Sequence, residues 1–245
     1  NGTGTLHTAL EVLDIGPGDE VIAPPLTMSA TAFSVLQANA TPVFADVDRE
    51  TFQISASSIL ERITKKTKAI MTVSLYGGSP DYESIRKVSS GLPIIGDNAE
   101  SFGTKYKGRD ISCLTEFSSY SFQSSKHLTS GEGGMLCTDS LEFADKARKF
   151  QSLGYSAVGA TTHKIDKKDI QDPNYLRHEM LGWNYRMNEI TAAVVLGQTE
   201  RAEELLAIRK LTGERIFSEV KDVEWLKPQG IYPETEHSYW AAPIL

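Results

Sequence analysis

Three polar residues between positions 97 and 126 have the types needed to hold and use an organic cofactor. Asp97 closes an apolar run, and Ser121 lies five residues before Lys126 in a serine-rich segment. A lysine amine can form a Schiff base, an aspartate can keep a pyridine nitrogen protonated, and a serine hydroxyl can bind phosphate. Pyridoxal 5'-phosphate requires these three functions together. The segment therefore predicts a pyridoxal-phosphate site with Lys126 as its catalytic residue.

The elements before this segment must place Asp97 where a ligand can reach it. Short apolar runs predict strands at residues 20–23, 42–47, 69–75 and 93–96, and amphipathic patterns predict helices at 5–14, 29–38, 55–63 and 82–89. Strands and helices that alternate in this way form βαβ units and a mostly parallel sheet. Nearly continuous apolar strands indicate helices on both faces. Ligands of such sheets bind beyond the carboxyl ends of the strands, where Asp97 is expected.

The second half of the chain is less regular. We expect strands at 117–122 and 134–138, a helix at 141–153, and a polar loop at 155–180. A single long helix is predicted over 187–210, with its small, apolar first half buried. The tail from 211 to 245 reads as a helix, a turn-rich stretch and the start of a further domain.

Composition narrows the classes of function. The chain has 245 residues and a net charge of −7, and its basic runs are short, which argues against nucleic-acid binding. The sequence has no apolar stretch of about 18 residues, so no membrane span is predicted. Its two cysteines, Cys113 and Cys137, match no metal or redox spacing. We expect both to be buried apolar fillers in a reducing, cytoplasmic setting.

Seven short segments follow one another in an order that resembles a known family. They are NGTGTLH (1–7), GPGDEVI (16–22), SLYG (74–77), DNAESFG (97–103), SFQSSK (121–126), GEGG (131–134) and GWNYRM (182–187). Together they resemble the DegT/DnrJ/EryC1/StrS family of sugar aminotransferases, which are fold-type-I enzymes that use pyridoxal phosphate. The resemblance covers almost the whole chain. Members are typically longer at both ends, which implies a large cofactor-binding domain at 1–208, without its N-terminal segment, and an incomplete C-terminal domain at 209–245.

Phosphate binding is expected from three places. Gly2, Thr3 and Gly4 open a helix, and free backbone N–H groups at a helix start favour an anion. Ser121 adds a hydroxyl group. The resemblance implies that Asn184 reaches the cofactor from the second subunit of a homodimer.

Two further candidates rest on the resemblance. Met28 falls where relatives usually place an aromatic ring against the cofactor face, and a polarisable thioether can make that contact. Glu100 occupies the position where the family often has glutamine beside the cofactor's 3'-oxygen. Both residues are therefore predicted to bind the cofactor.

The implied reaction moves an amino group from L-glutamate to a keto-sugar, which in this family is usually nucleotide-linked. The products serve surface polysaccharide, amino-sugar or antibiotic biosynthesis. Some relatives carry histidine in place of the lysine and dehydrate sugars, so Lys126 favours transamination. Two alternatives stay open: a sugar dehydratase-like enzyme, and a non-catalytic scaffold that binds cofactor or sugar.

Overall fold

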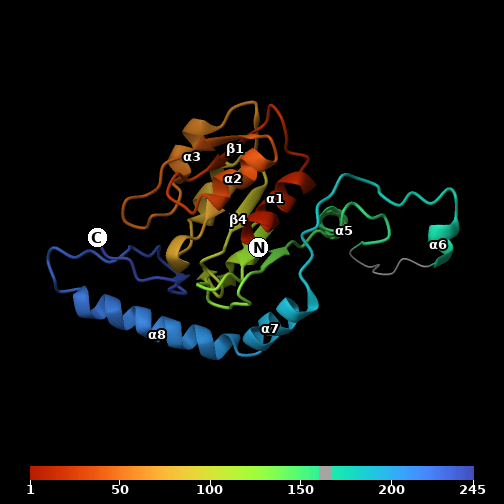
Figure 1. The fold of residues 1–245 in the computed structure, drawn as a ribbon. Coiled ribbons are helices and arrows are strands. Elements are labelled where there is room, and N and C mark those ends of the chain that lie inside the picture. The colour runs from red at the N-terminus through yellow and green to blue at the C-terminus, as the bar shows by residue number, and fades with distance from the viewer. Residues whose placement is uncertain (160–166) are drawn as a thin grey trace.

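A computed structural model describes residues 1–159 and 167–245 of the chain (Figure 1). Its centre is a six-stranded sheet in the order β2-β1-β3-β4-β7-β8. The strands are β1 (Glu20–Ala23), β2 (Thr41–Phe44), β3 (Thr67–Val73), β4 (Ile94–Asp97), β7 (Phe117–Ser121) and β8 (Gly134–Cys137). All neighbours pair in parallel except β8, which is antiparallel to β7. The predicted mostly parallel sheet is confirmed.

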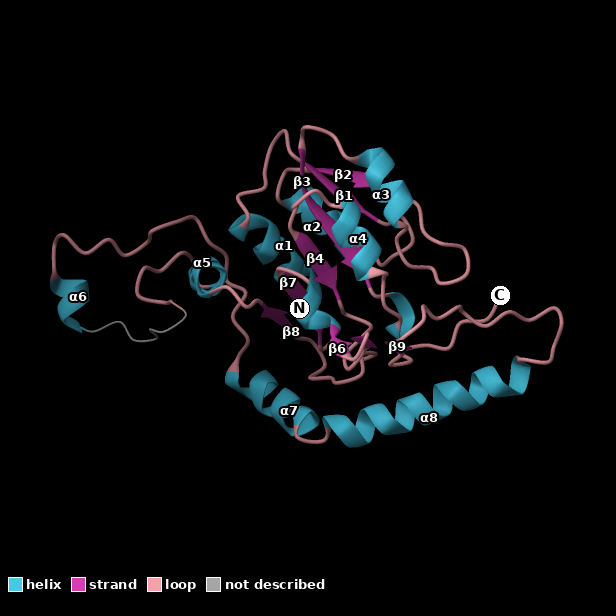
Figure 2. Cartoon of the chain, turned by 180° about the vertical axis from the view of Figure 1, so that it is seen from behind, coloured by secondary structure: helices cyan, strands magenta, loops and turns pink. Residues whose placement is uncertain are grey.

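Helices cover both faces of this sheet (Figures 1 and 2). One face packs on α1 (Gly2–Val12), α2 (Ala30–Gln37) and α5 (Leu141–Gln151), and the other on α3 (Ala56–Arg62) and α4 (Tyr82–Val88). The alternation of side chains along each strand explains the two cores. Val21 and Ala23 enter one apolar cluster, whereas Ile22 enters the other. Because both clusters are buried, the strands read as unbroken apolar runs.

A small second sheet pairs residues near the C-terminal end of the chain with the segment that follows β4. Its strands are β5 (Lys105–Tyr106), β6 (Arg109–Asp110) and β9 (Thr235–Glu236), in the order β6-β5-β9. Short 3-10 turns lie at Leu75–Gly77 and Ile111–Leu114. These elements were not predicted, since two-residue strands carry too little hydrophobic pattern to recognise.

The single long helix predicted over 187–210 is wrong. The structure has two helices, α7 (Glu189–Thr199) and α8 (Ala202–Val220), which turn apart at Glu200 and Arg201 (Figure 2). Arg201 leaves the helical conformation, with φ −107° and ψ 12°, and its guanidinium donates to the Glu204 carboxylate in the first turn of α8. Residues 187–210 contain no proline that would mark the break in the sequence.

The predicted burial of α7 is also wrong for the single chain. Only Val195 of α7 is buried, and Ile190 is 81% exposed. Within residues 1–159 and 167–245, no element covers this apolar face. The predicted loop at 155–180 contains a short helix, α6 (Lys167–Gln171), and its residues 160–166 lie outside the described part.

The cysteines differ from the expectation as well. Cys113 is exposed because it lies on the turn before β7, and Cys137 is half-buried at the end of the edge strand β8. Both are free thiols. Among the helices that the structure describes, none has the length and apolar character required to cross a membrane.

Candidate active site

A cavity of about 440 Å³ opens beyond the carboxyl ends of the parallel strands. It gathers most of the predicted site residues, which come from one helix start, two strand ends and three loops: Gly2, Thr3, Met28, Asp97, Glu100, Ser121 and Lys126. Two predicted residues do not line it. Gly4 is buried one residue further into α1, and Asn184 is exposed elsewhere on the chain. The cavity therefore joins residues that are remote in sequence at the rim where parallel sheets bind ligands.

Asp97 ends β4 and points a nearly buried carboxylate at the cavity. Only 5% of the residue is exposed. Thr31 Oγ1 donates to its Oδ2 at 2.8 Å, and the Ala99 backbone N–H donates to Oδ1 at 3.3 Å. Burial raises the pKa of Asp97 above its ordinary value, although these two hydrogen bonds oppose the shift. A buried carboxylate is stabilised by a nearby positive charge, which a protonated pyridine nitrogen would supply.

Lys126 lies in the turn that follows β7, and its amine is held inside the cavity. The Nζ atom is 3.2 Å from Glu100 Oε1, and the two side chains are only 13% and 12% exposed. Glu100 Oε2 in turn accepts the Tyr76 backbone N–H at 3.1 Å. This second bond fixes the carboxylate, so the lysine amine has a defined partner.

The start of α1 forms a cradle beside Ser121. Asn1 caps the helix by accepting the Gly4 N–H at 2.8 Å, so α1 begins at Gly2 and not at Thr5 as predicted. A Cβ atom built on Gly2 would lie 3.2 Å from the Ser121 Cβ. The helix start and the hydroxyl are thus adjacent with no side chain between them. Backbone amides of a first helical turn lack partners within the helix and favour an anion.

Two residues that sequence reasoning missed support Asp97. Thr31 binds its carboxylate directly. Asn98, fully buried, accepts from Ser74 Oγ at 2.9 Å and donates to Ser118 Oγ at 3.1 Å, so it links the residue that follows β3 to β7. Its identity is therefore explained by a buried polar network that joins the two strands on either side of β4. A threonine just inside a helix after β1 was the only sequence signal for Thr31.

Met28 and Asn184 occupy different surroundings. Met28 lines the mouth of the cavity and is 70% exposed. Asn184 lies in the connection between α6 and α7, where its backbone bridges Ser152. The next residue, Tyr185, anchors this loop to α1 because its hydroxyl lies 3.0 Å from His7 Nδ1. Asn184 is held away from its own chain's cavity.

These residues fit pyridoxal 5'-phosphate as a set. A helix start and a hydroxyl stand where a phosphate could bind, a buried carboxylate stands where a cationic ring nitrogen could bind, and a lysine amine projects into the same space. Two of these features are the most specific. The first-turn amides at Gly2 lack hydrogen-bond partners within the helix, and burial of the Asp97 carboxylate costs free energy unless a ligand compensates it.

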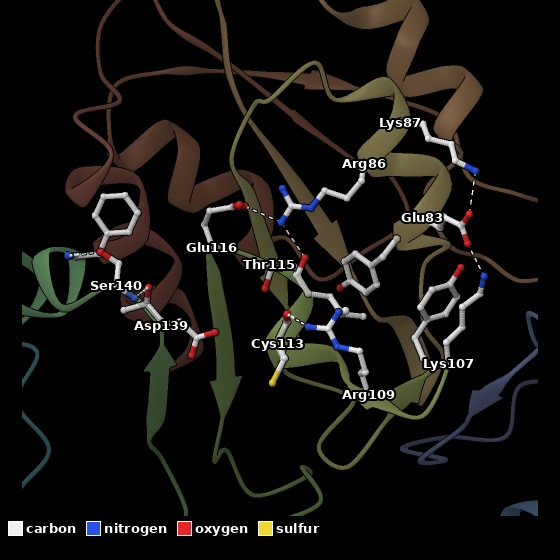
Figure 3. A pocket seen from close by; sticks show the side chains of 15 residues that line it. Glu83, Arg86, Lys87, Lys107, Arg109, Cys113, Thr115, Glu116, Asp139 and Ser140 are labelled. Carbon is white, nitrogen blue, oxygen red and sulfur yellow. Dashed lines mark hydrogen bonds and ion pairs between the residues drawn. The ribbon is translucent and has the colours of Figure 1, made fainter.

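A larger hollow of about 940 Å³ lies elsewhere, between α4, the β5–β6 hairpin and the start of α5 (Figure 3). Its basic side chains are mostly neutralised: Arg86 pairs with Glu116 at 3.0 Å, and Lys87 and Lys107 both bind Glu83. None of the predicted site residues lines it. The predicted site residues gather instead around the smaller cavity.

The chain is similar to known proteins over its whole length. A profile of the DegT/DnrJ/EryC1/StrS aminotransferase family matches residues 1–245. The chain is 37% identical over 247 residues to GDP-perosamine synthase of Escherichia coli O157:H7, a match that covers 100% of this chain and 63% of that protein. The chain therefore spans less than two thirds of the length of this relative.

Solved structures give the same result. 3-Amino-5-hydroxybenzoic acid synthase superposes with a TM-score of 0.89 at 28% identity, covering 100% of this chain and 61% of that one. NtdA from Bacillus subtilis, solved with its cofactor PMP, has a TM-score of 0.81 at 26% identity and covers 99% and 53% of the two chains. The predicted fold-type-I pyridoxal-phosphate transferase fold is confirmed.

Proposed function

Because the chain belongs to the DegT/DnrJ/EryC1/StrS aminotransferase family, whose members bind pyridoxal or pyridoxamine phosphate, we propose that it transfers an amino group from L-glutamate to a keto-sugar. One observation carries the proposal: Lys126, Glu100 and Asp97 line the same cavity, with the lysine amine 3.2 Å from a carboxylate. A protein that only bound a sugar would not require a largely buried lysine that shares a cavity with a buried aspartate.

Each residue has a separate part in the proposed reaction. When bound, pyridoxal phosphate supplies a carbon that binds amines and a ring that accepts electrons. Lys126 binds the cofactor carbon and, when released, holds and moves the proton of the substrate carbon. Asp97 keeps the ring nitrogen positively charged. Glu100 orients the lysine amine, which is 3.2 Å from its Oε1 atom, and would bind near the cofactor's 3'-oxygen.

The cofactor's remaining contacts come from neutral groups. The amides at Gly2, Thr3 and Gly4 and the Ser121 hydroxyl bind the phosphate, and Met28 contacts the ring. We propose that Asn184 completes the phosphate site of a second copy of the chain in a homodimer. Its exposed position, away from its own cavity, supports this assignment.

The acceptor is proposed to be a nucleotide-linked keto-sugar, on the strength of the similarity to GDP-perosamine synthase. Its product would enter surface polysaccharide or amino-sugar biosynthesis. The division of the chain at residues 208 and 209 and the cytoplasmic setting stay predictions.

An absorbance experiment tests the proposal. Full-length protein is incubated with pyridoxal phosphate, and spectra are recorded before and after addition of L-glutamate, for wild type and Lys126→Ala. Wild type is expected to show a visible band that fades with glutamate, and the variant to lack it. Lys65→Ala, which removes an exposed lysine, should behave as wild type.

The other outcomes identify the alternatives. A visible band that does not respond to glutamate would favour the dehydratase-like enzyme. A well-folded protein with no band at all would overturn the aminotransferase proposal and leave the scaffold.

A further inference from the structure

Trp240 is the one aromatic ring in the described chain that both lines the cavity and faces the Lys126 amine. Its ring centroid lies 4.6 Å from Lys126 Nζ. This distance is well inside the roughly 6 Å range over which the face of a tryptophan ring attracts a cation. The amine thus has two partners, the Glu100 carboxylate at 3.2 Å and the Trp240 face.

The indole is fixed in place by one hydrogen bond and one ring contact, and the Trp240 backbone by Arg209. Its Nε1–H donates to the Ser125 carbonyl at 2.9 Å, and its ring stacks on Tyr76 with an interplanar angle of 10°. Arg209 of α8 donates to the backbone carbonyls of Trp240 and Lys126, at 3.4 and 3.3 Å. The tryptophan and the lysine are therefore tied to one another through their backbones as well as their side chains.

The backbone around Trp240 packs closely on the body. We call residues 237–241 the C-terminal strap. Ser238 N–H donates to the Gly77 carbonyl at 2.9 Å, and Ala241 N–H to the Tyr76 carbonyl at 3.3 Å. A Cβ atom on Gly77, which has φ +102°, would lie 2.5 Å from the Tyr239 nitrogen. These close contacts hold the strap against the turn at Tyr76 and Gly77, so the indole has a fixed position at the edge of the cavity.

We propose that Trp240 is a positioning residue for Lys126: its indole face and the Glu100 carboxylate together form the resting place of the lysine ammonium whenever the lysine is not bonded to the cofactor. A lysine that moves a proton must be released and then held near the substrate carbon. A long side chain has many rotamers, and a two-sided cation site restricts them. The kinetic part of this inference rests on the proposed function, whereas its structural part does not.

The structural part is tested by chemical labelling of the cofactor-free, full-length protein. An amine-reactive ester is added at limiting concentration, and labelling of Lys126 is measured by peptide mass spectrometry. Trp240→Leu removes the ring face and should raise the labelling rate about three- to tenfold. Trp240→Phe keeps a face without the N–H group and should return the rate to within about twofold of wild type.

Two controls separate positioning from a loosened fold. Lys149, which is 19% exposed and paired with Asp145 and Glu179, serves as an internal reference whose labelling should not change. Trp225→Leu removes a tryptophan that is 78% exposed and should leave Lys126 labelling at the wild-type rate. Equal Lys126 labelling in wild type and Trp240→Leu would overturn the proposal.

The kinetic part uses the holoenzyme mixed with an amino donor. Trp240→Leu should slow the donor half-reaction and increase the primary isotope effect of an α-deuterated donor, while the donor concentration at half-saturation stays unchanged. Trp240→Phe should restore most of the rate. If wild type fails to respond to any donor, the proposed function fails while the labelling result still decides the positioning. If wild type responds and Trp240→Leu equals it in rate, the positioning role is wrong.

Discussion

At the scale of single residues, we expect the buried charge of Asp97 to lower the stability of the cofactor-free fold and to strengthen cofactor binding. Its carboxylate is almost fully buried, and burial raises its pKa in the folded chain. A raised folded pKa means that, in the cofactor-free protein, the charged form is penalised at pH values above the unfolded pKa. We predict that Asp97→Asn stabilises the cofactor-free protein at pH 7 by about 1–2 kcal/mol and weakens cofactor binding by at least about tenfold.

Thermal unfolding of the cofactor-free protein and a cofactor titration measure the two effects. The amide oxygen of asparagine can still accept the Thr31 hydrogen bond, so the substitution removes charge more than shape. Asp222→Asn, at an exposed position, should alter neither quantity. An Asp97→Asn variant with wild-type cofactor affinity would contradict the role assigned to Asp97.

Sequence reasoning found residues whose type alone indicates chemistry, and it missed those that act through distant partners. Lys126, Asp97 and Ser121 were placed by type and spacing, and the structure brings them into one cavity. Thr31 lies 66 positions from Asp97, and Trp240 lies 115 positions from Ser125, to which it is bonded. Such contacts depend on the strand order and on the return of the strap, which local patterns do not encode.

At the scale of elements, two helical glycines give a matched pair. Gly197 in α7 has open space where a Cβ would be, whereas a Cβ on Gly213 in α8 would lie 2.3 Å from the Tyr239 ring. Gly197→Ala should therefore stabilise the protein by about 0.5–1 kcal/mol, the usual gain in a helix interior. Gly213→Ala should destabilise it by about 1–3 kcal/mol, because the ring must move. Urea unfolding distinguishes the signs; a stabilising Gly213→Ala would show that α8 does not clamp the strap.

Two buried histidines make the strap sensitive to acid. Burial lowers the pKa of His127 and of His237 to about 4, and the neighbouring His127 adds to the effect on His237. Because both folded pKa values lie below the ordinary 6.5, the unfolded chain binds more protons between these pH values. The contribution of these two neutral histidines to the free energy of unfolding is therefore fully present above pH 6.5 and is lost as the pH falls to about 4.

The expected loss is on the order of 2–3 kcal/mol for each histidine. Urea midpoints of wild type and His237→Asn, measured at pH 7 and pH 4.5, test it. The variant should lose less stability between the two pH values than wild type. His178→Asn, at an exposed histidine, should show the wild-type loss. An identical loss in His237→Asn would mean that the buried pair does not govern the acid response.

Strands and helices were predictable where local sequence patterns alone indicate them. The strand at 20–23 and the helix capped by Ser55 were predicted and are confirmed, because unbroken apolar runs and capping residues are local signals. The division into α7 and α8 was not predicted, since it depends on a turn at Arg201 that no proline marks in the sequence. The exposed face of α7 was missed for a different reason: an apolar helix face indicates burial but not the partner that buries it.

At the scale of the whole molecule, the uncovered face of α7 bears on the proposed homodimer. Apolar side chains stand exposed on both sides of Asn184: Leu181 at 87%, Trp183 at 48% and Ile190 at 81%. A surface of this kind marks an interface. If a second copy covers it, Asn184 is carried to the partner at the same time, because it lies within the same exposed segment.

Two substitutions separate association from cofactor contact. Ile190→Glu places a charge in the proposed interface and should convert the dimer to monomer, which light scattering detects, with cofactor retention falling as a consequence. Asn184→Ala should leave the dimer intact and weaken cofactor retention by about tenfold, the effect of one hydrogen bond to a charged group. Leu60→Glu, at an exposed apolar residue of α3, should change neither property. A monomeric Ile190→Glu variant with full cofactor retention would place the whole cofactor site within one chain. Asn184 would then have a structural role in its own loop and no role in cofactor binding.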